Sequence, residues 1–274
     1  MSAQIDLETR MKTFYEQVPK TKLMRRCPVA IRIDGKAFRT FTRGFHRPFD
    51  DILIDSMQKT MKYLCENIQG CVLGYSQSDE ITLILIDYQK LESGAWFDYE
   101  VQKIASISAS MATMAFNKYF RENVIRFKGF VMKHFNFTDY KSLQDQAQIY
   151  ISAVEKGAMF DARCFNIPKE EVTNLIYWRQ FNATRNSVQM VGRANFSQKE
   201  LNSKGHTMIK AMLKTQKGII WENLPIHYQR GSCCIKKEDA ESLDSYKTWV
   251  IDKEIPIFKG EDRKYIDDLI FVGE

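Results

Sequence analysis

The sequence predicts an α+β fold whose core is an antiparallel sheet with the element order β-α-β-β-α-β. Three patterns in the first third of the chain indicate it. Val29, Ile31 and Ile33 recur at every second position, which is the period of a strand with one buried face. Apolar residues at helical spacing follow over 50–67. Two apolar runs around a polar turn then predict a hairpin over 71–86.

Later segments complete this order. Helical spacing over 98–123 predicts a second long helix, and alternation over 159–167 predicts a fourth strand. We expect both helices to pack on one face of the sheet and the opposite face to be free. The prediction is a core domain over 1–168 that includes an amphipathic N-terminal helix, with Met11, Phe14, Tyr15 and Val18 on one face. Helices up to about residue 218, followed by strands over 226–237 and 246–258, should form an extension over 169–274 packed on that core.

The β-α-β-β order brings distant acids together. In a split β-α-β unit the third strand inserts between the first two, so the end of strand one lies beside the start of strand three. Asp34 should therefore lie near Asp79 and Glu80. Converging carboxylates repel one another unless cations intervene, and two Mg²⁺ ions ~4 Å apart suit phosphoryl or nucleotidyl transfer. The alternative is two unrelated turn acids, because Asp-Gly and Ser-Asp are common in turns.

Composition limits the classes of function. The chain has 274 residues, a formal net charge of +6 and a pI near 8.9, a balance that suits a polyanionic partner. No long apolar run predicts a membrane span and no leader is recognised at the start of the sequence, so we expect no membrane association. Six cysteines without a C-x-x-C pair are typical of reduced thiols in a cytoplasmic protein, and strand alternation should place the adjacent Cys233 and Cys234 on opposite faces of a strand.

Two basic segments are candidate contacts for phosphate groups. The segment after Asp34 carries cations among phenylalanines, and its Lys36, Arg39 and Arg47 suit the charged oxygens of a triphosphate. A basic stripe interleaved with aromatic residues follows the second long helix and is a candidate for contact with a nucleic-acid backbone. The candidate RNA contacts are Lys103, Lys118, Arg121, Arg126, Lys128 and Arg179.

Five motifs together make a family recognisable. They are R-I-D-G-K-A-F at 32–38, G-Y-S-Q-S-D-E at 74–80, F-D-A-R at 160–163, W-R-Q at 178–180 and Y-Q-R-G-S at 228–232. In this order, over roughly residues 8–236, the chain resembles the tRNA-histidine guanylyltransferase family, and within it the guanylyltransferase-like 3′-to-5′ RNA polymerases. The resemblance implies a polymerase-palm-like fold, two Mg²⁺ ions, ATP and GTP as substrates, a tRNA partner and a homotetramer.

The resemblance also assigns roles to residues. Asp34 and Asp79 match the family's metal-binding carboxylates, Gly35 matches the residue whose backbone oxygen contacts the metal, and Glu80 matches the neighbouring catalytic acid. Arg47 stands where the family has a lysine, and Arg39 where it has a histidine. The positions that match nucleotide-contacting segments are Asp34, Gly35, Lys36, Ala37, Phe38, Arg39, Arg47, Ser78 and Asp79.

The chain departs from the family after W-R-Q. Guanylyltransferases proper carry H-I-N-N-L-Y-N, whereas this chain has T-R-N-S-V-Q-M at 184–190, in which only Asn186 matches. The departure favours template-directed repair of 5′-truncated tRNA, with ATP or GTP activating the 5′ phosphate. The alternatives are non-templated guanylate addition to histidine tRNA, a palm-fold nucleotide cyclase, and a non-catalytic tRNA-binding protein.

Overall fold

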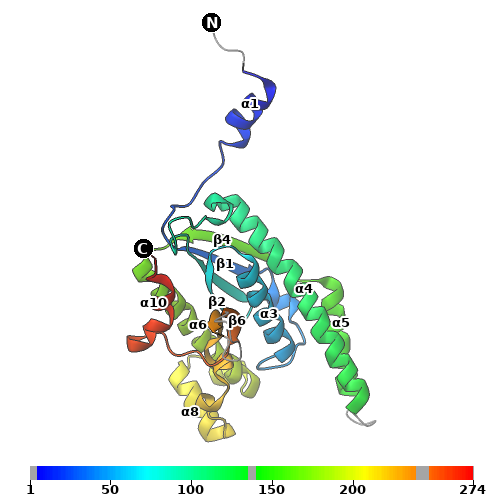
Figure 1. Cartoon of the computed structure of the whole chain (residues 1–274). Coiled ribbons are helices and arrows are strands. Elements are labelled where there is room, and N and C mark those ends of the chain that lie inside the picture. Colours follow the sequence, from blue (N-terminus) through cyan, green and yellow to red (C-terminus); the bar gives the residue numbers. More distant parts are fainter. Residues whose placement is uncertain (1–4, 135–139, 239–246, 274) are drawn as a thin grey trace.

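The computed structural model describes residues 5–134, 140–238 and 247–273 (Figure 1). Helices surround one six-stranded sheet. The strands are β1 (Val29–Gly35), β2 (Cys71–Gln77), β3 (Glu80–Leu85), β4 (Phe160–Asn166), β5 (Ser232–Glu238) and β6 (Lys247–Asp252). The α-helices are α1 (Leu7–Met11), α2 (Phe38–Phe41), α3 (Asp51–Asn67), α4 (Val101–His134), α5 (Tyr140–Lys156), α6 (Lys169–Asn195), α7 (Gln198–Leu201), α8 (His206–Lys217), α9 (Ile226–Arg230) and α10 (Lys264–Ile270).

All the strand pairs of this sheet are antiparallel. The strand order is β4-β1-β3-β2-β5-β6, so β3 lies between β1 and β2, as the split β-α-β prediction requires. The second crossover places β4 beside β1 and completes the predicted core. β5 then pairs with β2, and β6 pairs with β5, so the C-terminal region extends the same sheet.

Alternation along the strands produces two apolar layers. Ile31 and Ile33 of β1 face α3 and α4, which cover one side of the sheet as expected. The prediction of a free opposite face was wrong. Ala30, Ile84 and Tyr75 point to that face and are buried in a second cluster with residues of α6 and α10. Apolar side chains on both faces of the inner strands require cover on both, and the C-terminal helices supply it.

Several boundaries differ from the predictions. α4 continues eleven residues past the predicted end at 123, and α5 forms where no element was assigned. A strand was predicted from residue 226, but α9 occupies 226–230, because Pro225 precedes its first turn and Gly231, with a φ of 84°, ends it. The predicted second C-terminal strand begins at 246, outside the described residues, and β6 ends at Asp252.

The N-terminal helix forms but stays exposed. An amphipathic helix was predicted, with Met11, Phe14, Tyr15 and Val18 on one face. α1 is followed by a π-helical turn over Lys12–Glu16. Phe14 is 53% exposed and Val18 71% exposed. Figure 1 shows α1 standing away from the rest of the molecule. The amphipathic pattern therefore predicted a helix correctly but not a buried face.

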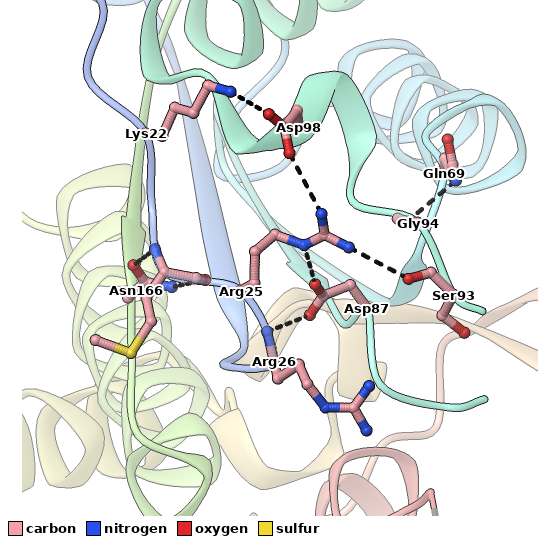
Figure 2. Close-up of polar contacts among 10 residues, drawn as sticks. Lys22, Arg25, Arg26, Gln69, Asp87, Ser93, Gly94, Asp98 and Asn166 are labelled. Carbon is pink, nitrogen blue, oxygen red and sulfur yellow. Dashed lines mark hydrogen bonds and ion pairs between the residues drawn. The ribbon is translucent and has the colours of Figure 1, made fainter. Parts of the chain in front are cut away.

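A polar network fixes the segment that precedes β1, at the opposite end of that strand from Asp34 (Figure 2). The buried Asp87 carboxylate accepts hydrogen bonds from Arg25 Nε at 2.7 Å and from the Arg26 backbone N–H at 2.8 Å. Arg25 and Lys22 also pair with Asp98. This network anchors the segment that leads into β1, on the side of that strand away from Asp34.

No helix in the described part of the chain is long and apolar enough to cross a membrane. All six cysteines are free thiols. Cys233 and Cys234 belong to different apolar layers, which agrees with the prediction that strand alternation places them on opposite faces of the sheet.

Candidate active site

A row of polar side chains crosses one end of the sheet. In the strand register Asp34 of β1 lies opposite Asp161 of β4 on one side and opposite Glu80 of β3 on the other. Glu80 in turn lies opposite Gln77 of β2. Directly opposed residues of antiparallel strands project to the same face with Cβ atoms ~5 Å apart. The row therefore places three carboxylates on neighbouring strands.

Asp79 lies in the two-residue turn between β2 and β3 and joins this row. The Gly35 backbone N–H donates to the Asp79 carbonyl oxygen at 3.1 Å, which ties the turn to the end of β1. Ser78, with a φ of 51°, donates its hydroxyl to Asp79 Oδ1 at 2.9 Å. Burial raises the pKa of Asp79, and the nearby charge of Asp34 raises it further. Asp34 and Asp79 therefore meet, as the sequence predicts.

Glu80 has a different environment from these two aspartates. Its carboxylate pairs with Arg32 Nη2 at 3.0 Å and with Arg179, and accepts a hydrogen bond from Gln77 Nε2 at 3.1 Å. The Arg179 side chain is only 7% exposed. Because two guanidinium groups and an amide already satisfy its oxygens, Glu80 is a poor cation ligand in this arrangement. Its placement indicates that it positions the two arginines.

The segment after β1 turns sharply beneath the carboxylates. A Cβ added at Gly35 would lie 2.2 Å from the Phe38 ring, so glycine is needed for that ring to pack under the strand. Ala37 has a φ of 54° and begins α2. Phe38 is buried among aromatic residues of α4 and β4, so only its backbone is available to a nucleotide.

The predicted cations occupy three separate places. Lys36, Arg39 and Arg47 are exposed around the carboxylate end of the sheet. The α4 cations are exposed along the layer that covers the other face of the sheet: Lys103, Lys118, Arg121, Arg126 and Lys128. Arg179 is not with them. It lies buried on α6 against Glu80, so the structure does not join it to the α4 stripe.

Sequence reasoning missed a polar groove that begins at Glu80. It is lined by Glu80, Arg179, Asn182, Arg185, Asn186, Gln189, Lys204, Gly205 and His206. The signal was present in α6, because residues 182, 185, 186 and 189 recur at helical spacing and share one face. What sequence reasoning lacked was the contact between that face and the loop before α8. The groove carries positive charge from α6 and from the loop before α8 toward the carboxylates.

The donor set suits a hard divalent cation only in part. No three His, Cys, Asp or Glu side chains among the described residues are grouped closely enough to hold a metal ion by themselves. Two carboxylates and a backbone carbonyl remain, and Mg²⁺ commonly binds one or two carboxylates and completes its shell with water and substrate phosphates. The unbalanced charge of Asp34 beside the half-buried Asp79 favours such an ion. No ion pair of Asp34 occurs in the described part of the chain.

A family model supports this arrangement. The model for tRNA(His) guanylyltransferase matches residues 8–168, which is more than half of the chain. The chain belongs to the tRNA(His) guanylyltransferase family. Members of this family are nucleotidyltransferases that act on tRNA, and this chain is an enzyme of that class.

Relatives of known structure cover almost the whole molecule. A bacterial tRNA(His) guanylyltransferase-like protein in complex with ATP is 36% identical, has a TM-score of 0.79 and covers 98% of this chain and 100% of its own. A bacterial tRNA(His) guanylyltransferase-like protein in complex with GTP is 34% identical and has a TM-score of 0.71. The match covers 97% of this chain and 100% of that protein. The enzyme from Saccharomyces cerevisiae, 19% identical with a TM-score of 0.61, covers 88% of this chain and 96% of its own, and shows the shared fold.

One sequence relative extends the match beyond the catalytic core. A probable tRNA(His) guanylyltransferase from Dictyostelium discoideum is 23% identical over 265 residues, which are 92% of this chain and 88% of the relative. The tRNA(His) guanylyltransferase fold thus includes β5, β6 and the C-terminal helices of this chain. The palm-like fold predicted from the sequence is confirmed.

Proposed function

We propose that this enzyme adds nucleotides in the 3′-to-5′ direction to the 5′ end of truncated tRNA, selecting each nucleotide against the opposing acceptor strand. The observation that carries the proposal is the meeting of Asp34 and Asp79 at the end of the sheet, within a family that transfers nucleotides to tRNA. The ATP and GTP bound to the two bacterial relatives support a nucleoside triphosphate as substrate.

Asp34, Asp79 and the backbone carbonyl of Gly35 would hold Mg²⁺. When bound, the metal neutralises phosphate charge and lowers the pKa of an attacking hydroxyl, which is the chemistry that nucleotidyl transfer needs. The exposed guanidinium and ammonium groups of Lys36, Arg39 and Arg47 bind the remaining phosphate oxygens. Catalysis by this chain is then mainly orientation and charge neutralisation.

The proposed reaction has two transfers. First, a 5′-phosphate oxygen of the tRNA attacks the α-phosphorus of ATP or GTP, and pyrophosphate leaves. The 3′-hydroxyl of the incoming nucleotide then attacks the activated 5′ phosphorus, and the nucleoside monophosphate leaves as the new phosphodiester bond forms. The 5′-triphosphate that the added nucleotide keeps can drive the next addition. Each step breaks one phosphoanhydride bond.

Two basic surfaces are candidates for the tRNA. The α4 cations are spaced along a long helix, and Lys103 to Lys128 spans ~37 Å along its axis. Arg185 and Lys204 line the groove that leads to Glu80. We assign the acceptor end to the groove, because it opens onto the carboxylate row, and the body of the tRNA to α4. Charge reversal at Arg185 should therefore impair addition more than charge reversal at Lys118.

The segment at 184–190 supports templated repair over obligatory guanylate addition. Asn186, its one match to the guanylyltransferase motif, lines the groove, while Arg185 replaces a neutral residue of that motif. A cation beside an amide suits backbone contact at any tRNA rather than recognition of one base. The homotetramer stays a prediction from the family resemblance, and the mass of the protein in solution tests it. The cytoplasmic location stays a prediction from the reduced thiols.

The test uses tRNAs shortened by one nucleotide at the 5′ end, with each of the four bases placed opposite the gap. With ATP, Mg²⁺ and all four nucleotides, the incorporated base should follow the opposing base. Guanylate added whatever the opposing base would establish the narrower enzyme instead. Cyclic nucleotide formed without tRNA would indicate a cyclase, and tRNA binding without any incorporation would indicate a non-catalytic module.

A further inference from the structure

Two aromatic side chains on α6 are exposed beside the polar groove. Trp178 is 50% exposed and Phe181 is 49% exposed. Residues three apart are neighbours on the surface of a helix, so the two rings share one side of α6. Each ring is in contact with an arginine that lines the groove, Arg179 for Trp178 and Arg185 for Phe181. The two rings therefore lie on the rim of the groove.

The arginines hold the two rings without covering them. The Arg179 guanidinium lies over the Trp178 ring, 4.9 Å from its centroid. The Arg185 guanidinium lies 5.8 Å from the centroid of the Phe181 ring. A guanidinium over an aromatic face is attractive, so each contact limits the movement of its ring. Because each ring is still about half exposed, its remaining surface is open to a ligand.

Trp178 lies close to the carboxylate row. Arg179, which contacts its ring, also pairs with Glu80. Glu80 lies opposite Asp34 in the strand register. The Arg179 side chain is only 7% exposed, so its position is fixed between the ring and the carboxylate. A flat group that stacks on Trp178 would therefore lie beside the candidate active site.

Exposed aromatic rings next to arginines suit unpaired nucleotides. Bases of single-stranded RNA stack on aromatic side chains, and neighbouring cations bind the phosphates that link them. Bases inside a duplex already stack on one another, so only an unpaired strand can use such rings. A two-fold contact between copies of this chain would bring their exposed Arg185 side chains together. The charge of this surface therefore favours RNA over a second copy.

We propose that Trp178 and Phe181 form a stacking platform for the unpaired nucleotides of the acceptor strand, which face the shortened 5′ end of the tRNA. Trp178 stacks on the base nearer the carboxylates and Phe181 on a base farther along the groove, while Arg185 binds the phosphate between them. This inference rests on the proposed function, because it takes the acceptor end to lie in the groove. It deepens that function by naming the side chains that hold the strand to be copied.

The test measures binding of two tRNAs to the full-length protein at equilibrium, without nucleotides. Both tRNAs are shortened at the 5′ end. One keeps its unpaired acceptor-strand nucleotides, and the acceptor strand of the other ends flush with the shortened 5′ strand. Wild type should bind the first tRNA more tightly. Trp178→Ala should reduce this preference at least about 5-fold and leave the affinity for the flush tRNA unchanged. Trp178→Phe should keep most of the preference, because phenylalanine retains an aromatic face.

Phe271→Ala is the matched control. Phe271 is 53% exposed, much as Trp178 is. The neighbouring Ile270 carbonyl accepts a hydrogen bond at 2.9 Å from Tyr88, which follows the end of β3, whereas Glu80 begins β3. Phe271 therefore lies toward the end of the sheet away from the carboxylates. Its variant should bind both tRNAs as wild type does.

An unchanged preference in folded Trp178→Ala would overturn the platform. An equal loss of affinity for both tRNAs, or a changed mass of the protein in solution, would also overturn it, because either would indicate a different contact. If Trp178→Ala does not fold, Phe181→Ala decides in the same way. The assay contains no nucleotide, so its result is separable from nucleotide addition. A Trp178-dependent preference in a protein that adds nothing to tRNA would refute the proposed function and leave the platform standing.

Discussion

The backbone N–H of Gly35 donates to the carbonyl oxygen of Asp79 across 3.1 Å, although 44 positions separate the two residues in the sequence. This single bond joins the end of β1 to the turn that follows β2. It places the carboxylate of Asp34, next to Gly35, near the carboxylate of Asp79. The proposed chemistry depends on this juxtaposition, so changes at the junction have distinct and measurable effects.

Gly35→Ala should destabilise the protein and disrupt the nucleotide segment. The added Cβ meets the buried Phe38 ring at 2.2 Å, and overpacking of this kind costs about 1–3 kcal/mol. Urea denaturation measures the loss. Gly129→Ala is the control, because nothing lies within 4 Å of its added Cβ and it sits inside α4. That change should stabilise the protein by about 0.5–1 kcal/mol. Equal stability of the two variants would contradict the packing described at Gly35.

Glu80→Gln tests whether this acid is structural or catalytic. The substitution leaves Arg32 and Arg179 close together without their counter-charge, so the free energy of unfolding should fall by about 3–5 kcal/mol. Asp161→Asn breaks an exposed pair with Arg163, so a change below about 1 kcal/mol is expected. A Glu80→Gln protein as stable as wild type but inactive would instead place Glu80 among the catalytic groups, as the motif alone predicts.

The pattern of apolar residues along the sequence predicts much of the fold, but only part of the candidate site. Alternation in β1 and the hairpin at 71–86 were enough to predict that Asp34 and Asp79 meet, because strand order fixes which ends are adjacent. The environment of Glu80 was not predictable, since Arg179 reaches it from a helix 99 residues away. The strand predicted over 226–237 begins only at Ser232, because Pro225 and Gly231 bound a short helix that alternation does not reveal.

Asp87→Asn should loosen the anchor in front of β1. The Asp87 side chain is fully buried, and its carboxylate accepts from Arg25 and from the Arg26 backbone (Figure 2). Loss of the charge should lower the free energy of unfolding by about 2–4 kcal/mol. Asp98→Asn removes an acid that is 56% exposed and should cost less than about 1 kcal/mol. Thermal melts of the two variants side by side would contradict this ranking if Asp98→Asn were the more damaging.

Stability should fall with acid because of His227. Burial and Lys253 hold its folded-state pKa below the ordinary value near 6.5. The unfolded chain therefore binds protons more readily, so the stability contributed by neutral His227 is present above about pH 6.5 and is lost as pH falls through the folded-state pKa. Denaturation curves between about pH 7.5 and about pH 5.5 should show a smaller loss for His227→Phe than for wild type. Parallel losses would contradict a buried neutral imidazole.

Asp79→Asn tests the contribution of Asp79 to catalysis separately from its contribution to stability. Because burial and Asp34 raise the pKa of Asp79, its charge disfavours the folded state, so the variant should be no less stable than wild type when metal is chelated. The direct measurement is Mg²⁺-dependent addition of one labelled nucleotide to a 5′-truncated tRNA under single-turnover conditions. We predict a loss of at least about 100-fold for folded Asp79→Asn. Addition at the wild-type rate would contradict the claim that Asp34 and Asp79 together form the catalytic centre.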